Sequence, residues 1–285
     1  MKNKSVYWIL GLFVILLSGC NSENDNVSAG SNLSTDPQTR NKVDKWIKDN
    51  YTDPYNIDVA YRWTESLTDQ GRYLSPAHID SVIPALKIIK KLWIDPYSQV
   101  GGADFVKKIA PRQIVLVGGL NVNPSGTITL GLAEAGKRIT LFNVNLLEKK
   151  NRYALTQFIK TIQHEYVHIL NQTKPFNVST WGRISPEGYT AQWFNENDPE
   201  SRSAGFITAY ARANESEDFA EMASEMLGRS FGEWNTLITS ITPPSGITKI
   251  RVKEKIVSDY YLDNFKVNIY TLQDSVYRAT IRLTR

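Results

Sequence analysis

The stretch His-Glu-Tyr-Val-His at residues 164–168 decides the fold, because it lies in a segment, 151–170, whose apolar residues recur every three or four positions. That spacing predicts one long amphipathic helix. His164 and His168 are one helical turn apart, so their side chains lie on the same face. Two histidines at this spacing can share one zinc ion, and Glu165 can reach a water on that ion.

The histidine face is predicted to lie roughly opposite the apolar stripe of the helix, alongside Gln157, Lys160 and Thr161. The histidines are therefore not expected to point into the core against which the helix packs. A lone histidine is usually a surface group or a hydrogen-bonded core group. A pair at this spacing with an acid between its members favours a metal site instead.

The N-terminus has the order of a secretory signal. Lys2 and Lys4 precede an apolar run at 6–17, and the Leu-Ser-Gly-Cys sequence that ends at Cys20 resembles the lipobox of bacterial lipoproteins. The apolar run is too short to span a bilayer. We expect 1–19 to be a signal peptide and Cys20 to be lipidated, and the alternative is a cleaved secretory signal with an incidental cysteine. Cys20 is the only cysteine, which excludes an intramolecular disulfide.

The remaining chain divides by composition. Residues 20–38 are rich in Ser and Asn and predict a flexible tether. Residues 39–285 are long enough for one domain, with a predicted upper sheet-and-helix part at 39–172 and a lower helical part at 173–285. The formal charge of +4 falls to +2 when the two lysines of the signal are removed, and it gives no indication of nucleic-acid binding.

The pattern of apolar residues predicts an α+β fold. Helical spacing is expected from about residue 39 and again from Pro76 to Leu92. Short β-branched runs separated by turn residues predict three strands of a small, largely antiparallel sheet at 114–117, 127–130 and 138–142. Two more helices are expected at 247–262 and 269–283, with a packing role.

A catalytic zinc needs a third protein ligand. His78 is the only other histidine and lies far upstream, so a carboxylate is favoured. A predicted helix at 214–227 supplies five acids, which are Glu215, Glu217, Asp218, Glu221 and Glu225. Acids four residues apart suit the site, because one can bind the metal while the other hydrogen-bonds a ligating histidine. Both pairs that contain Glu221 qualify, so spacing alone leaves the ligand open.

The segment from Tyr210 to Glu221 resembles the zinc segment of anthrax lethal factor and its gluzincin relatives, in which a tyrosine stands seven residues before the ligand. The resemblance implies that Glu217 is the third ligand, Tyr210 the catalytic tyrosine and Glu221 an acid that supports a ligand. Thermolysin-like enzymes use Asn-Glu-x-x-x-Asp. Residues 214–215 begin that pattern, but Phe219 stands in place of its Asp, which leaves Glu215 as the rival.

The whole layout, from lipobox to zinc segment, also resembles the zinc-binding metallopeptidase lipoproteins of Bacteroidota, of the type associated with substrate import. The resemblance implies a zincin-like fold, one Zn²⁺ per chain and a lipid-anchored location at the outer membrane. It also implies a peptide or protein substrate and TonB-dependent transporter components as partners.

The sequence therefore predicts a zinc metallopeptidase in which Glu165 is the general base. The alternatives are an inactive surface binding protein of an importer and an enzyme of the same fold that cleaves another amide bond. The long segment 174–205 carries four aromatic residues, Trp181, Tyr189, Trp193 and Phe194, which are candidates for substrate contact. The alternative, and the more usual role of such rings, is to pack the loop onto its domain. Residues 138–145 are the candidate edge strand for an extended peptide.

Overall fold

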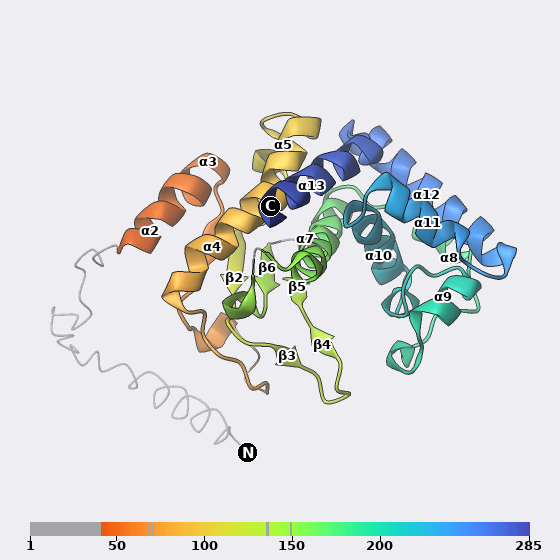
Figure 1. Cartoon of the computed structure of the whole chain (residues 1–285), viewed down its shortest axis with the longest axis horizontal. Coiled ribbons are helices and arrows are strands. Elements are labelled where there is room, and N and C mark those ends of the chain that lie inside the picture. Colours follow the sequence, from red (N-terminus) through yellow and green to blue (C-terminus); the bar gives the residue numbers. More distant parts are fainter. Residues whose placement is uncertain (1–40, 68, 70, 135–136, 149) are drawn as a thin grey trace, which may run out of the picture. The chain divides into compact units, whose positions relative to one another are not determined.

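The computed structural model describes residues 41–67, 69, 71–134, 137–148 and 150–285. Helices and small sheets combine in it, which confirms the predicted α+β class (Figure 1). In this part of the chain no helix is long and apolar enough to cross a membrane. The predicted signal peptide, Cys20 and the tether at 20–38 lie outside the described residues.

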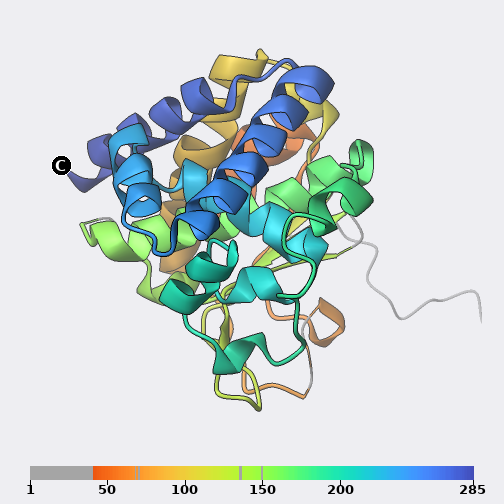
Figure 2. The same cartoon turned by 90° about the vertical axis from the view of Figure 1, so that its right-hand side faces the viewer.

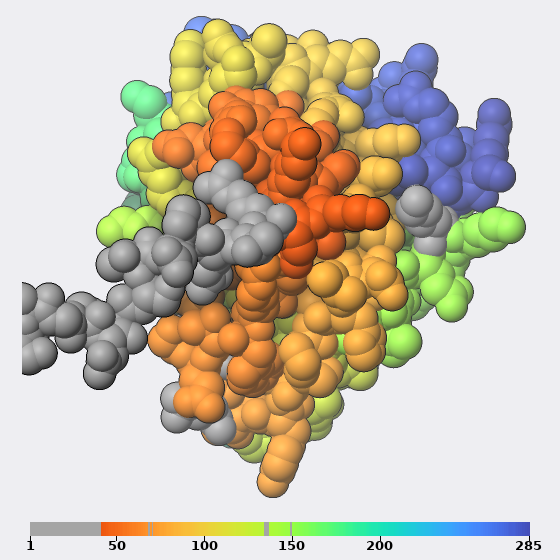
Figure 3. Space-filling view, turned by 90° about the vertical axis from the view of Figure 1, so that its left-hand side faces the viewer, coloured from red at the N-terminus to blue at the C-terminus, as the bar shows by residue number. Residues whose placement is uncertain are grey.

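The N-terminal helices occupy much of the face shown in Figure 3. Their bounds are α2 (Lys42–Ile47), η1 (Lys48–Thr52), α3 (Asp53–Tyr55), α4 (Ile79–Ile89), η3 (Lys90–Ile94), α5 (Asp95–Gly101) and α6 (Phe105–Lys108). Asn41 and Asp44 form a capping box that starts α2. The helix predicted from Pro76 begins three residues later, because Pro76 pairs with Val117 in an isolated antiparallel bridge.

Two sheets precede the motif helix. Their strands are β1 (Asp58–Ala60), β2 (Gln113–Leu116), β3 (Asn121–Val122), β4 (Ile128–Thr129), β5 (Gly131–Glu134) and β6 (Arg138–Leu141). The larger sheet has the order β1-β2-β6-β5, and β3 and β4 form a separate hairpin. β2 runs parallel to β1 and to β6, whereas β5–β6 and β3–β4 are antiparallel. The larger sheet is therefore mixed, not largely antiparallel as predicted.

The prediction of an edge strand at 138–145 is wrong, because β6 lies between β2 and β5. The edge on this side is β5, whose sequence Gly-Leu-Ala-Glu has no β-branched residue and gives a weak strand signal. Parallel pairing of β2 with β6 follows from the path of the chain, since the hairpin and β5 together turn β6 back into the direction of β2.

The motif helix α7 (Arg152–Thr173) lies between the strands and the C-terminal helices (Figure 1). The later elements are α8 (Val178–Gly182), η5 (Trp193–Asn195), α9 (Asp198–Ala204), η6 (Tyr210–Arg212), α10 (Glu215–Leu227), α11 (Phe231–Thr239), α12 (Pro244–Phe265) and α13 (Ile269–Thr284). One apolar core extends from α2 through α7 to α13 and holds α10 against α7. Figure 2 shows the β3–β4 hairpin and the segment around η5 at the same end of the molecule.

Candidate metal centre

Two histidines of α7 and one carboxylate of α10 meet between the helices. Nε2 of His164 lies 2.9 Å from Oε2 of Glu217 and 3.1 Å from Nε2 of His168. Nε2 of His168 lies 3.3 Å from the same carboxylate oxygen. Among the described residues, these three are the group of His, Cys, Asp and Glu side chains that could hold a metal ion.

The separations of the three donor atoms fit zinc. Ligand bonds of about 2.0–2.1 Å in tetrahedral geometry place neighbouring donor atoms about 3.3 Å apart. The observed separations of 2.9, 3.1 and 3.3 Å need only a small outward movement to accept such an ion. Three protein ligands would leave the fourth position for water or substrate, which is the composition of a catalytic site and not of a closed structural one.

The start of α10 positions Glu217. Asn214 caps the helix, and its side-chain oxygen accepts hydrogen bonds from the N–H groups two and three residues later, the second of which belongs to Glu217. Glu215 faces elsewhere, since Oε1 of Glu215 lies 3.1 Å from the position that a Cβ atom on Gly182 would take. The structure thus brings Glu217, and not the rival Glu215, to the two histidines.

The histidine face of α7 is covered by α10. His164 is only 7% exposed, and Lys160 on the same face forms an ion pair with the buried Glu225 of α10. The prediction that the histidines point away from the core is therefore wrong, because α10 packs against the histidine face of α7 and belongs to the same apolar core. His168 and Glu217 keep 17% and 19% of their side chains exposed, so the cluster is partly enclosed, which strengthens its electrostatic interactions relative to bulk water.

A second carboxylate, that of Glu221 one turn after Glu217, forms a hydrogen bond with the ring nitrogen of His164 that faces away from the cluster. Nδ1 of His164 donates to Oε1 of Glu221 at 2.8 Å, which leaves Nε2 to face the cluster. The hydroxyl of Thr208 donates to Oε2 of Glu221 at 2.6 Å. Burial would raise the pKa of Glu221, but its contacts with His164 and Thr208 lower it below the ordinary value. Sequence analysis missed Thr208, because a single threonine between helices carries no motif.

The charges of the cluster favour a cation. Burial would lower the pKa of His164, yet hydrogen bonds to Glu217 and Glu221 raise it well above the ordinary value. Burial would also raise the pKa of Glu217, but hydrogen bonds from His164 and His168 bring it far below its usual range. The carboxylates therefore stay ionised at neutral pH and offer negative charge to whatever occupies the site.

Glu165 lies beside the cluster and next to the edge strand β5. Its side chain is buried, and Oε1 is 3.0 Å from the position that a Cβ atom on Gly131 would take. Burial raises the pKa of Glu165, and the neighbouring His164 and His168 offset part of that rise. A carboxylate with a raised pKa is a better proton acceptor near neutral pH than an ordinary glutamate.

Tyr210 reaches the site from η6. Its ring stacks on that of His164, with centroids 5.8 Å apart and planes inclined by 29°. Burial, and then the neighbouring carboxylate of Glu217, raise the pKa of the phenol, so it keeps its proton and can donate a hydrogen bond. Trp193 packs edge-on against Tyr210 with ring centroids 4.7 Å apart. Trp193 is thus the aromatic residue of the 174–205 segment that touches the site through Tyr210.

The aromatic residues Trp181 and Tyr189 have a packing role. Trp181 is fully buried, and its Nε1 donates to Oδ2 of Asp218 at 2.8 Å. The hydroxyl of Tyr189 donates to the same oxygen at 2.9 Å. Lys253 completes this buried group with a 2.6 Å ion pair to Asp218. Trp181 therefore has no surface to offer a substrate, and both aromatic residues fasten the 174–205 segment to α10.

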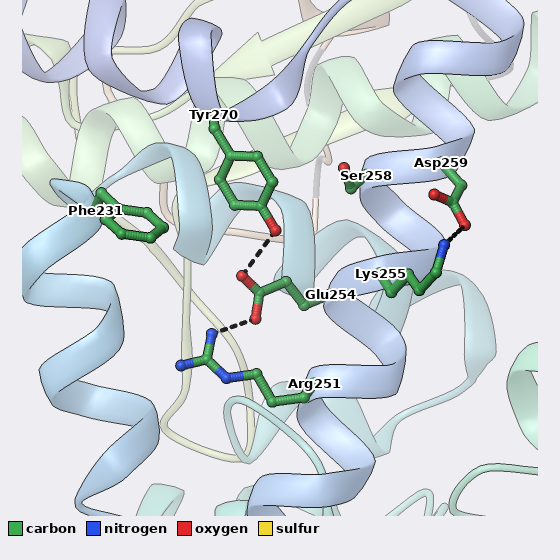
Figure 4. Close-up of a pocket in the computed structure, with 7 residues that line it drawn as sticks. All are labelled: Phe231, Arg251, Glu254, Lys255, Ser258, Asp259 and Tyr270. Atoms are coloured by element: carbon green, nitrogen blue, oxygen red, sulfur yellow. Dashed lines mark hydrogen bonds and ion pairs between the residues drawn. The ribbon is translucent and has the colours of Figure 1, made fainter.

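A pocket of about 840 Å³ lies elsewhere, among α11, α12 and α13 (Figure 4). Of its two acids, Glu254 is paired with Arg251 at 2.6 Å and with the hydroxyl of Tyr270 at 3.0 Å, and Asp259 is paired with Lys255 at 2.6 Å. None of the residues that line it belongs to the metal cluster. The pocket is therefore separate from the candidate metal centre.

Comparisons with known proteins agree with this geometry. Residues 36–270 match the model of a family described as "Putative zinc-binding metallo-peptidase". The crystal structure of a "putative zinc-binding metallo-peptidase" from Bacteroides caccae is similar, with a TM-score of 0.71 and 33% sequence identity. That alignment covers 85% of this chain and 92% of the other. No match to a curated protein was found.

In this α+β fold a His-Glu-x-x-His helix faces an acid-bearing second helix, and their side chains form a group that could hold a metal ion, as expected of a zinc-binding metallopeptidase. Within that class, the family match over most of the chain is decisive. The protein belongs to the family described as "Putative zinc-binding metallo-peptidase", whose model matches residues 36–270.

Proposed function

We propose that this protein is a zinc metallopeptidase in which His164, His168 and Glu217 bind one Zn²⁺. The observation that carries the proposal is the convergence of these three donor atoms at 2.9–3.3 Å, with the buried Glu165 beside them. The glutamate third ligand and Tyr210 favour the gluzincin subclass. Zinc, when bound, lowers the pKa of its water toward about 7 and polarises the scissile carbonyl.

Glu165 and Tyr210 perform the proton transfer and charge stabilisation in this proposal. Glu165 accepts the proton of the attacking water and passes it to the leaving amine, a transfer that its raised pKa favours. Tyr210 donates a hydrogen bond from its protonated phenol to the oxyanion that forms at the carbonyl carbon. One such donor is worth about 3 kcal/mol of transition-state stabilisation.

An extended peptide is proposed to add to the free edge of β5. The N–H of Phe142 donates to the carbonyl of Leu130 across the β5–β6 pairing. Because hydrogen-bonded and non-hydrogen-bonded pairs alternate in antiparallel strands, the backbone groups of Gly131 and Ala133 point away from β6. They can pair with a substrate strand, which would then pass Glu165.

We also propose that the protein is a lipoprotein anchored through Cys20 to the outer membrane, where it serves a TonB-dependent import system. The signal-like sequence at 1–20 and the family resemblance support this location. Mass spectrometry of the N-terminus of the full chain from membranes should find a lipidated Cys20, and a soluble wild-type chain with an unmodified cysteine would contradict the proposal.

The test of the peptidase proposal combines metal content with hydrolysis. A soluble fragment from residue 21 should contain one zinc ion, which Glu217→Ala removes and Glu215→Ala retains. A peptide library should be cleaved by the wild type and not by Glu165→Gln, although Glu165→Gln keeps its zinc. A wild type that holds zinc but cleaves no peptide or other amide would favour the alternative of an accessory binding protein.

A further inference from the structure

The hydroxyl of Thr208 joins two separate parts of the site. It donates to Oε2 of Glu221 at 2.6 Å and accepts a hydrogen bond from the N–H of Ala211 at 3.1 Å. Thr208 is only 8% exposed and Ala211 is fully buried. The buried Ala211 amide cannot exchange this partner freely for water, so loss of the hydroxyl would leave it without a hydrogen bond. Glu221, whose side chain is 15% exposed, would keep only its hydrogen bond from His164.

The two hydrogen bonds of Thr208 lead to different functional groups. Glu221 uses its other oxygen to accept the Nδ1–H of His164, at 2.8 Å. Ala211 directly follows Tyr210 in the single turn η6, whose geometry sets where the Tyr210 ring lies on His164. Thr208 thus contacts Glu221, which supports the proposed zinc ligand His164. It also contacts the η6 turn, which carries Tyr210, the proposed donor to the oxyanion.

Side chains of α9 form hydrogen bonds with the backbone on either side of Thr208. The N–H of Ala209 donates to Oδ1 of Asp198 at 2.9 Å, and Nε of Arg202 donates to the carbonyl of Ile207 at 3.0 Å. Arg202 and Asp198 also form an ion pair with each other, at 2.9 Å. These anchors hold Thr208 in place, so its hydroxyl is a fixed point to which Glu221 and the η6 turn both attach.

We propose that Thr208 is a positioning residue that fixes His164, through Glu221, and Tyr210, through the Ala211 amide, in one geometry. The proposal rests on the zinc peptidase function proposed above. Without the hydroxyl, Glu221 loses one of its two donors and is free to rotate away from Nδ1 of His164. The η6 turn loses its acceptor at the same time, which releases the Tyr210 ring from its place on His164.

The first test compares Thr208→Val, which keeps the shape of the side chain, with Thr208→Ser, which keeps the hydroxyl. Zinc affinity is measured without substrate, by competition with a chromogenic chelator. Thr208→Val should weaken zinc binding by about 10- to 100-fold, the usual effect of losing a group that supports a ligand, and Thr208→Ser should restore it. Thr280→Val is the control, because Thr280 is equally buried and bonds only within α13.

Two results would overturn the proposal. Thr208→Val could bind zinc as tightly as Thr280→Val, or Thr208→Ser could be as weak as Thr208→Val, in which case the methyl group and not the hydroxyl matters. A wild type that binds zinc but cleaves no peptide would overturn the peptidase proposal alone, because the affinity comparison still decides the role of Thr208 toward His164.

The link to Tyr210 is tested by a double-mutant cycle on kcat with Thr208→Val and Tyr210→Phe. If Thr208 acts through Tyr210, the double variant should lose much less activity than the product of the two single losses. If the loss of kcat in the double variant equals the product of the two single losses, the proposed action of Thr208 through Tyr210 is overturned. KM should change less than kcat in Thr208→Val, since the hydroxyl lies behind the site and not on the proposed substrate path.

Discussion

Gly131 of β5 lies directly against Glu165 of α7. A Cβ atom on Gly131 would come within 3.0 Å of Oε1 of Glu165 and within 2.5 Å of Cγ2 of Thr161. The edge strand and the motif helix therefore approach each other more closely than any side chain at position 131 would allow. This approach keeps the proposed general base beside the strand to which a peptide would add.

Replacing Gly131 by alanine should displace Glu165 and leave the zinc ligands in place. We expect kcat to fall by about 10- to 100-fold, because a displacement of about 1 Å at a reacting group can cost as much, while zinc content stays at the wild-type value. Gly232→Ala is the control, since the nearest atom to its added Cβ is 4.0 Å away. Unchanged kcat in Gly131→Ala would show that the close approach of Gly131 does not position Glu165.

The ion pair of Asp218 and Lys253 predicts a large difference between two lysine substitutions. Both side chains are fully buried, and Lys253→Met would leave Asp218 as an uncompensated buried charge, at a cost of about 3–5 kcal/mol in unfolding free energy. Lys255 pairs with Asp259 at the surface, where both side chains are more than half exposed, so Lys255→Met should cost less than about 1 kcal/mol.

Urea unfolding of the zinc-free variants measures this difference. Equal losses in the two lysine variants would show that the buried pair is no more important to stability than the exposed one. Adding Asp218→Asn to Lys253→Met should recover part of the loss, because the unpaired charge is then removed together with its partner.

The helices that carry the site could be predicted because their signals are local. The three- and four-residue spacing around His164 predicted α7, and Asn214 followed by the alternation of acids and apolar residues predicted α10. Four-residue spacing favours Glu217, Glu221 or Glu225 as the ligand, and the family resemblance selects Glu217 among them. In the structure the choice has a physical basis, because the cap at Asn214 directs Glu217 toward α7 and leaves Glu215 facing Gly182.

The features that sequence analysis missed depend on contacts between distant segments. β5 is a strand because it pairs with β6, and its own residues favour that state only weakly. The pairing of β2 with β6 brings together residues 25 positions apart, which no local pattern encodes. Whether Trp181 packs the loop or contacts substrate is left open by its local sequence, and the structure shows packing, because its buried indole lies against Phe219 and donates to Asp218.

Trp193 should affect substrate choice without affecting the metal. Its ring packs on Tyr210 at 4.7 Å, and its neighbour Phe194 is 44% exposed. Trp193→Ala should therefore raise KM most for peptides with large apolar side chains near the scissile bond, while zinc content stays constant. Trp181→Phe is the comparison, because it loses the hydrogen bond to Asp218 and should lower the unfolding temperature with no change in preference. Equal preference profiles for wild type and Trp193→Ala would contradict a substrate contact.

Removal of zinc should destabilise the protein, because the proposed ligands lie on two helices that the ion would hold together. At free zinc about 1,000 times its dissociation constant, the gain in unfolding free energy is about 4 kcal/mol.

The gain from zinc should depend on pH through His164. Carboxylate neighbours raise the pKa of His164 well above its ordinary value of 6.5. Its protonated form therefore stabilises the zinc-free chain fully below pH 6.5, and this stabilisation is lost as the pH rises through the folded-state pKa. Zinc competes with that proton, so the gain should increase between pH 5 and pH 8. Thermal unfolding with and without a chelator measures it, and a gain that persists in His168→Ala would place the stabilising ion elsewhere.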